Sequence, residues 1–155
     1  MEIHQILEQM QTTWDGDPWF GRSVKELLSE VTEDIAFQKP SGQHSIVELL
    51  WHMITWKEFV ISRLRENPDK TIHQFESEDW RTLDHSDFSL WKKGLNEYSR
   101  LQKELVSILQ TKKDEILDHG VTERKYNFRQ LLHGIIQHDI YHAGQIAYLK
   151  KLLTA

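Results

Sequence analysis

The chain has 155 residues, a formal net charge of −5 and no cysteine. This length predicts a single domain over residues 1–155 that buries a core without covalent staples, and the lack of cysteine excludes disulfides, zinc fingers and thiol nucleophiles. Scattered Lys and Arg do not form the basic face that nucleic-acid binding requires, so we expect no nucleic acid as a partner. No apolar run reaches 18 residues and no signal peptide is visible, which predicts a cytoplasmic protein without membrane contact.

Apolar residues at helical spacing predict a first helix over residues 2–13. Glycine and proline then predict a loop over 14–21. Ser23, followed three residues later by Glu26, has the pattern of a capping box and predicts a short extra helix after the first. A connector over 39–43 separates this piece from the next helix.

The next helix begins with a second capping box, Ser45 with Glu48, and its apolar pattern ends before Asn67-Pro68 after about twenty residues. The polar stretch 67–85 is long for a loop without structure of its own, so part of it is expected to be functional or packed over the helices. Three apolar side chains in this stretch are its predicted anchors: Phe75, Trp80 and Leu83.

A third long helix is predicted from Ser86 or Asp87 to about Thr111, and residues 115–117 predict a short helical turn. Asn127 as N-cap, with Gln130 at the capping-box position, opens a last helix that runs to about Leu153. No stretch shows the period-two alternation of apolar and polar residues that would indicate a strand. Long helices with polar connectors predict an all-α chain folded as a four-helix bundle.

The last helix carries His138 and His142 four residues apart. Positions i and i+4 share one helical face, so two imidazoles can bind one divalent ion there. The same stripe carries core-type leucines, which predicts that it points inward. A hydrogen-bonded core pair is the alternative interpretation. No glutamate lies between the two histidines as in zinc proteases, and Asp139 points about 100° away, as a surface charge or a partner of a neighbouring residue.

His52 on the second long helix is the predicted third ligand, because a histidine in an apolar stretch needs a partner. Three neutral imidazoles leave at least one coordination position open, as in catalytic zinc sites. Imidazole suits zinc, nickel, copper and iron, and we expect zinc or nickel.

Two further residues are candidates for catalysis. Glu48 lies one turn before His52 and could orient it or act as a base, but its capping-box position explains it as well. Gln145 could donate a hydrogen bond to a metal-bound water, or it could satisfy buried backbone.

The opposite side of the last helix is also apolar: Ile136, Ile140, Ala143, Gly144 and Ala147. A helix that is apolar on nearly all sides is buried on both. The helix therefore either lies centrally among its neighbours or contributes this side to a subunit contact, and we predict a homodimer with two-fold symmetry.

Two segments carry a resemblance to a known family. HGIIQHDIYHAGQI (133–146) and GQHSIVELLWHMITW (42–56) are similar to the two signature segments of the DinB/YfiT-like superfamily, and WFGRSVKELL (19–28) resembles one bacterial branch of it. The resemblance implies a four-helix bundle with up-up-down-down topology, often dimeric, in which His52, His138 and His142 hold a divalent metal ion. Phe20 departs from that branch, which often has a histidine at this position.

Relatives of this kind include enzymes that add low-molecular-weight thiols to substrates, a thiol-dependent isomerase, and proteins called metal-dependent hydrolases. The resemblance therefore implies a metal-dependent transferase that uses a low-molecular-weight thiol and a small-molecule substrate. Two alternatives stay open: a hydrolase whose metal activates water, and a non-catalytic dimeric binding module linked to stress responses.

Overall fold

The computed structural model describes residues 1–65 and 68–155, and all regular structure within them is helical except for one isolated bridge between Gly120 and Asn127. The long helices are α1 (Glu2–Asp15), α4 (Ile46–Leu64), α6 (Ser89–Gln110) and α7 (Phe128–Thr154). The short ones are α2 (Val24–Ser29), α3 (Glu33–Ala36), α5 (Ile72–Ser77) and the 3₁₀ turn η1 (Asp114–Asp118). The all-α prediction is confirmed, and α2 is the expected extra helix.

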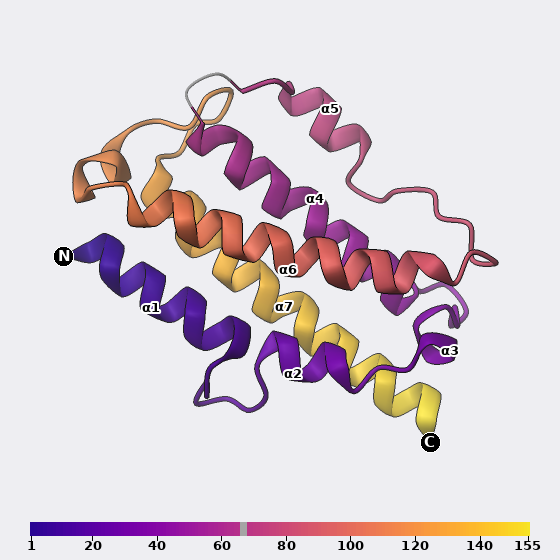
Figure 1. The fold of residues 1–155 in the computed structure, drawn as a ribbon. Helices are drawn as coiled ribbons and strands as arrows, with labels where there is room; N and C mark the ends of the chain where they lie inside the picture. Colours follow the sequence, from indigo (N-terminus) through magenta and orange to yellow (C-terminus); the bar gives the residue numbers. More distant parts are fainter. Residues whose placement is uncertain (66–67) are drawn as a thin grey trace.

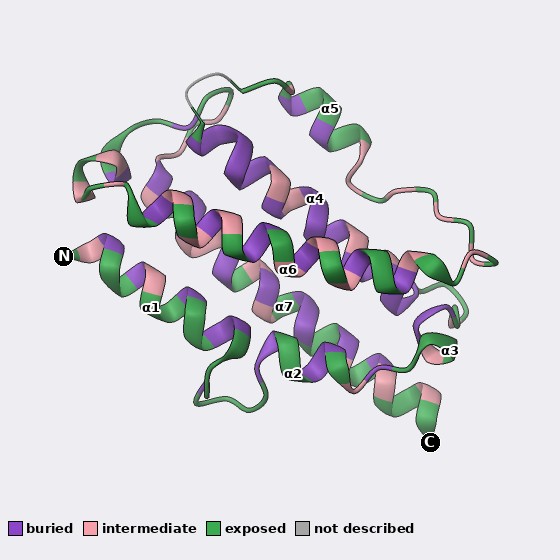
Figure 2. Cartoon of the chain, in the orientation of Figure 1, coloured by how far each residue is buried: buried purple, intermediate pink, exposed green. Residues whose placement is uncertain are grey.

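The four long helices form a closed ring of contacts, in which α4 packs against α6 and α7, and α1 packs against the same two helices (Figure 1). Buried residues line the inward sides of these helices, while exposed residues cover their outer sides (Figure 2). Leu50, Phe59, Tyr98 and Leu105 are among the most deeply buried side chains. α7 has buried residues along most of its length, so it forms the centre of the fold.

The directions of the helices differ from the up-up-down-down order that the resemblance implied. α1 and α7 run from left to right in Figure 1, whereas α4 and α6 run from right to left. In chain order the helices therefore run up, down, down and up. Parallel neighbours need a connection about as long as a helix, and the structure places this crossover between α4 and α6 rather than between α1 and α4.

The predicted helix starts are confirmed at two capping boxes. Ser45 accepts a hydrogen bond from the backbone N–H of Glu48, whose carboxylate accepts from the backbone N–H of Ser45. Asn127 and Gln130 make the same reciprocal pair at the start of α7. These caps satisfy backbone donors that the first helical turn leaves without partners. They fix where α4 and α7 begin, and so the register of the histidines on them.

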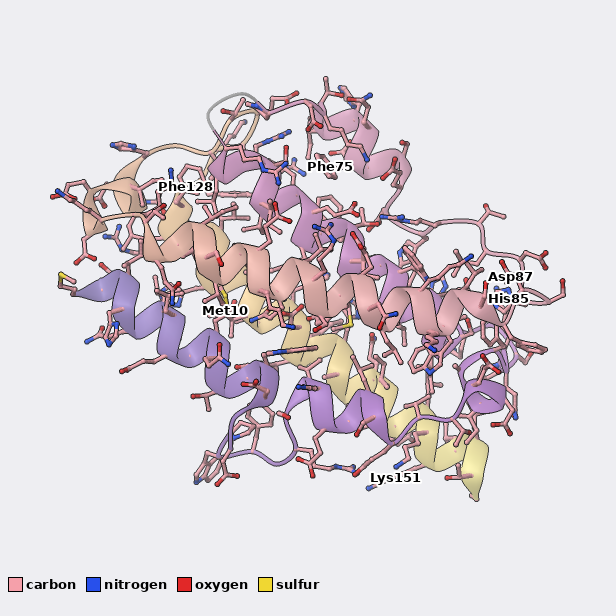
Figure 3. The ribbon with its side chains drawn as sticks, in the orientation of Figure 1. Met10, Phe75, His85, Asp87, Phe128 and Lys151 are labelled. Atoms are coloured by element: carbon pink, nitrogen blue, oxygen red, sulfur yellow. The ribbon has the colours of Figure 1, made fainter. Side chains whose placement is uncertain are left out.

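The crossover between α4 and α6 packs over the outer side of α4. Phe75 of α5, labelled in Figure 3, is a predicted anchor that the structure confirms. It is buried, and its ring centroid lies 5.4 Å from that of Phe59. Leu83 is half-buried, and Trp80 is 37% exposed. Asn67 lies outside the described residues; α4 ends at Leu64.

The second apolar side of α7 lies largely inside the chain itself. Ile136 and Ala143 are buried, and Ile140 and Ala147 pack against the core, whereas Gly144 is exposed. α1 and α2 contact α7 and supply cover. A central position for α7 is thus what the structure shows, and the homodimer stays a prediction. No helix in the described part of the chain is long and apolar enough to cross a membrane.

Candidate metal centre

The three predicted histidines lie together between α4 and α7. Nε2 of His52 lies 3.0 Å from Nε2 of His142 and 3.1 Å from Nε2 of His138. One nitrogen from each ring falls within 4.8 Å of the others. Two nitrogens bound to one tetrahedral zinc ion at roughly 2.0–2.1 Å would lie about 3.3 Å apart. The spacing in this structure therefore fits a shared divalent ion.

The other ring nitrogens show how two of these imidazoles are protonated. Nδ1 of His52 lies 2.8 Å from the backbone oxygen of Asp79, and Nδ1 of His142 lies 2.6 Å from Oε1 of Gln145. Both partners are acceptors, so each Nδ1 must carry the proton, and each Nε2 of the neutral ring then holds a lone pair. Two lone pairs consequently face each other at 3.0 Å. A cation between the nitrogens would remove the repulsion between these lone pairs.

Burial favours the neutral form of His138 and His142, which is the form that a metal needs. Removal from water lowers the pKa of His138 to about 3, with the neighbouring His142 and His52 rings adding to the effect. Burial also lowers the pKa of His142, although its hydrogen bond to Gln145 opposes the shift. Nδ1 of His138 is buried and has no hydrogen-bond partner among residues 1–65 and 68–155.

Asp79 contacts the histidine cluster, and the sequence interpretation did not single it out. Its carboxylate Oδ1 lies 3.1 Å from Nδ1 of His52 and accepts a hydrogen bond of 2.6 Å from the indole N–H of Trp56. An outer carboxylate of this kind fixes the tautomer and orientation of a metal-binding imidazole. The only signal in the sequence is the unusual length of the 67–85 connector, which does not single out one residue.

Trp80 covers the exposed face of His52. Their rings stack with centroids 4.0 Å apart and planes 5° apart, and His44 stacks on the other face of the indole at 3.7 Å. The crossover therefore holds His52 twice, by the Asp79 oxygens at its edge and by the indole on its face. These contacts leave the imidazole little freedom to rotate.

Glu48 and Gln145, the two candidates for catalysis, occupy different surroundings. The Glu48 carboxylate binds the α4 N-terminus and lies near Lys39, His44 and His85. Although partial burial opposes it, these hydrogen bonds lower the pKa of Glu48 to about 2. The structure places Glu48 in the helix cap and brings Gln145 against His142.

Asp139 is buried, which corrects the expectation of a surface charge. Its Oδ2 accepts a hydrogen bond of 2.7 Å from Nζ of Lys57, which also donates to Oε1 of Gln102 at 2.6 Å. Lys57 is 1% exposed. The helical wheel placed Asp139 away from the histidines correctly, but this side of α7 also faces the core. The ion pair thus joins α4 and α7 beside the histidines.

Two pockets border the histidines. The apolar pocket, of about 520 Å³, lies between α4 and α7 and has walls that include Trp56, Phe59, Val60, Leu131 and Ile135. The polar pocket, of about 660 Å³, has walls that include Gln43, His44, Gln145 and Tyr148. Tyr141 and His142 line both pockets. A ligand in either pocket would reach the imidazoles.

Comparison with known proteins shows the family of the chain. The sequence profile of the DinB superfamily matches residues 21–146, a range that includes all three histidines. The chain belongs to the DinB superfamily. Among curated proteins it is 30% identical over 121 residues to YizA, an uncharacterized protein of Bacillus subtilis (strain 168), in a match that covers 75% of this chain and 69% of YizA.

Proposed function

We propose that the chain binds one divalent metal ion through His52, His138 and His142, and that this ion supports the transfer of a low-molecular-weight thiol to a small-molecule acceptor. One observation carries the metal site: the Nε2 lone pairs of His52 and His142 face each other at 3.0 Å. Hydrogen bonds at both Nδ1 atoms exclude a simple N–H···N bond between two neutral rings. A divalent ion resolves the repulsion.

The chain's own residues hold and orient the imidazoles. Asp79 and Gln145 hold the Nδ1 protons of His52 and His142, so the Nε2 lone pairs converge. α4 and α7 pack directly against each other, and we propose that the ring of long helices is the four-helix bundle of the family. A bound divalent ion would lower the pKa of a thiol and so supply a thiolate nucleophile near neutral pH.

The walls of the apolar pocket favour thiol transfer over hydrolysis. Of its described lining residues, none carries a carboxylate that could serve as a general base. Glu48 has a pKa of about 2, far from the neutral range in which a base works best. Thiol transfer needs no such base once the thiolate is formed. The sulfur of the thiolate forms a bond to an electron-poor carbon of the acceptor. The bond from this carbon to its leaving group breaks, the electron pair departs with the leaving group, and the thiol proton passes to water.

Metal analysis of the purified protein tests the site. We expect close to one zinc or nickel ion per chain, and we expect His138→Ala to weaken zinc binding at least about 100-fold, because losing a ligand exceeds the 10–100-fold effect of losing an outer partner. His133→Ala is the matched control, since His133 lies on the same helix outside the cluster. Full metal retention in His138→Ala would contradict the site.

A conjugation screen with several cofactor thiols tests the reaction. Product that forms only with metal-loaded protein supports the transferase. Metal-dependent release of an ester or amide product without a thiol would instead select the hydrolase. Metal binding with neither reaction would leave a binding module and overturn the proposed transfer.

A further inference from the structure

The two pockets differ in chemistry although they meet at the same two residues. Of the described residues that line the apolar pocket, none is permanently charged, and aromatic and aliphatic side chains predominate. The polar pocket also has no permanently charged residue among its described lining, but beside Leu49, Trp80 and Leu149 it presents two amides, two phenols and the His44 ring. Tyr141 and His142 form the wall that both pockets share. Volumes of 520 and 660 Å³ lie within the usual range of small-molecule sites.

Each pocket also has a glycine from the interior of α7 in its wall: Gly134 in the apolar pocket and Gly144 in the polar pocket. A glycine inside a helix is about 1 kcal/mol less favourable than alanine. Neither residue has the positive φ that favours glycine, and a Cβ on either would meet no described atom within 4 Å. Neither the backbone nor the packing of the chain therefore explains these glycines.

Gly94 of α6 shows the contrasting case. A Cβ there would lie 2.8 Å from Cδ2 of Leu50 and 3.1 Å from Nε1 of Trp51, so the close packing of α6 on α4 requires glycine. At Gly134 and Gly144 the missing side chain instead opens space beside the imidazoles. A larger side chain at either position would take up volume of the pocket that it lines.

We propose that the two pockets bind two ligands side by side, an uncharged and largely apolar acceptor beside Gly134 and the polar thiol beside Gly144. The proposal rests on the proposed function and adds the chemical class of the acceptor. A charged group among the aromatic and aliphatic walls of the apolar pocket, away from the imidazoles, would lose hydration without gaining a partner, which is strongly unfavourable. The shared wall at His142 places the reacting ends of both ligands next to the cluster.

N-phenyl-1-naphthylamine, an uncharged apolar fluorophore, tests the apolar pocket without any reaction. We expect it to bind metal-free and zinc-loaded protein, and Gly134→Leu to weaken binding at least about tenfold, since the leucine fills space that the probe needs. Gly144→Leu is the matched control, with the same change on the same helix, and should stay within about twofold of the unmodified protein. Equal effects of both variants, or no binding at all, would overturn the apolar site.

Calorimetry with glutathione, cysteine and coenzyme A on zinc-loaded protein tests the polar pocket. We expect at least one thiol to bind, Gly144→Leu to weaken it about tenfold, and Gly134→Leu to leave it unchanged. If no thiol binds while the fluorophore does, the thiol assignment fails together with the proposed transfer, and the apolar site stands. If Gly134→Leu converts a dimer to a monomer in sedimentation, the apolar pocket is a contact between two copies and the acceptor site is overturned.

Circular dichroism and zinc stoichiometry keep both variants interpretable. Leucine favours a helix more than glycine does, and open space surrounds both positions. Each variant is therefore expected to keep its helix content and to bind one zinc ion per chain. Loss of zinc in Gly134→Leu would show that the glycine serves the imidazole cluster rather than the pocket, and would overturn its assigned role.

Discussion

Two polar clusters join α4 to α7, and they differ in whether a donor of the chain faces an acceptor. In one, the Lys57 ammonium donates to the Asp139 carboxylate at 2.7 Å, so a buried donor meets a buried acceptor. In the other, the Nε2 lone pair of His52 faces that of His142 at 3.0 Å, so an acceptor meets an acceptor. Buried polar groups in folded proteins are almost always satisfied. The chain supplies both charges of the first cluster, although Oδ1 of Asp139 and Nε2 of Gln102 have no hydrogen-bond partner among the described residues. On the proposed function, an ion from outside the chain supplies the positive charge of the second cluster.

Breaking the ion pair between Lys57 and Asp139 should have the largest effect on stability. Lys57→Met leaves Asp139 buried without its cation, and we expect the free energy of unfolding to fall by about 3–5 kcal/mol in urea titrations. The double variant Lys57→Met/Asp139→Leu should recover most of this loss, because both charges are then gone. A loss below about 1 kcal/mol in the single variant would show that water or a rearranged partner satisfies the carboxylate.

Competition between protons and the metal ion tests the histidine cluster. Because burial lowers the pKa of His138 to about 3 and also lowers that of His142, protons compete with the metal only below the ordinary imidazole pKa of about 6.5. Zinc affinity should therefore stay level from pH 8 to about 6.5 and fall only at lower pH, as the pH approaches these lowered pKa values. Competition titrations against a chelator of known pH dependence measure this. A loss of affinity of about tenfold already at pH 6 would show that burial does not keep these imidazoles neutral.

The smallest effect on the free energy of unfolding is expected at Glu48, whose carboxylate caps the N-terminus of α4. Its pKa of about 2 lies below the ordinary value of 4.5, so between these pH values the unfolded chain binds more protons than the folded one. The stabilisation is present above pH 4.5 and is lost as pH falls toward 2. The unmodified protein should therefore be more stable than Glu48→Gln at pH 5. This difference in the free energy of unfolding should shrink by about 1 kcal/mol between pH 5 and pH 3, allowing for solvent screening.

Urea titrations at pH 5, 4 and 3 measure this difference. Glu115→Gln, at an exposed position of η1, is the control for the loss of one carboxylate elsewhere. If both variants follow the same pH profile, the Glu48 cap contributes no specific electrostatic stabilisation.

Local signals in the sequence predicted most of the helices and all three clustered histidines. Capping boxes marked the starts of α4 and α7, and helical spacing placed His138 and His142 on one inward face. Both depend on residues within a few positions of each other, which is the range over which sequence patterns report structure. His52 was found from its apolar surroundings rather than from any local partner.

The features that were missed depend on how distant segments cross. Asp79 and Trp80 reach His52 because the chain crosses over between α4 and α6, and periodicity does not give the direction of that crossover. Asp139 was assigned to the surface since its partner, Lys57, lies 82 residues earlier. Long-range pairing of this kind has no signature in either sequence neighbourhood.

The separation of the histidines along the chain has a consequence for how the protein is made. His52 precedes His138 by 86 residues and His142 by 90. Synthesis begins at the N-terminus, so a growing chain carries one histidine of the cluster until α7 is produced. A single imidazole holds a divalent ion weakly, so on the proposed function the ion is captured only after the last helix has been made. Metal content would then report that a chain is both complete and folded.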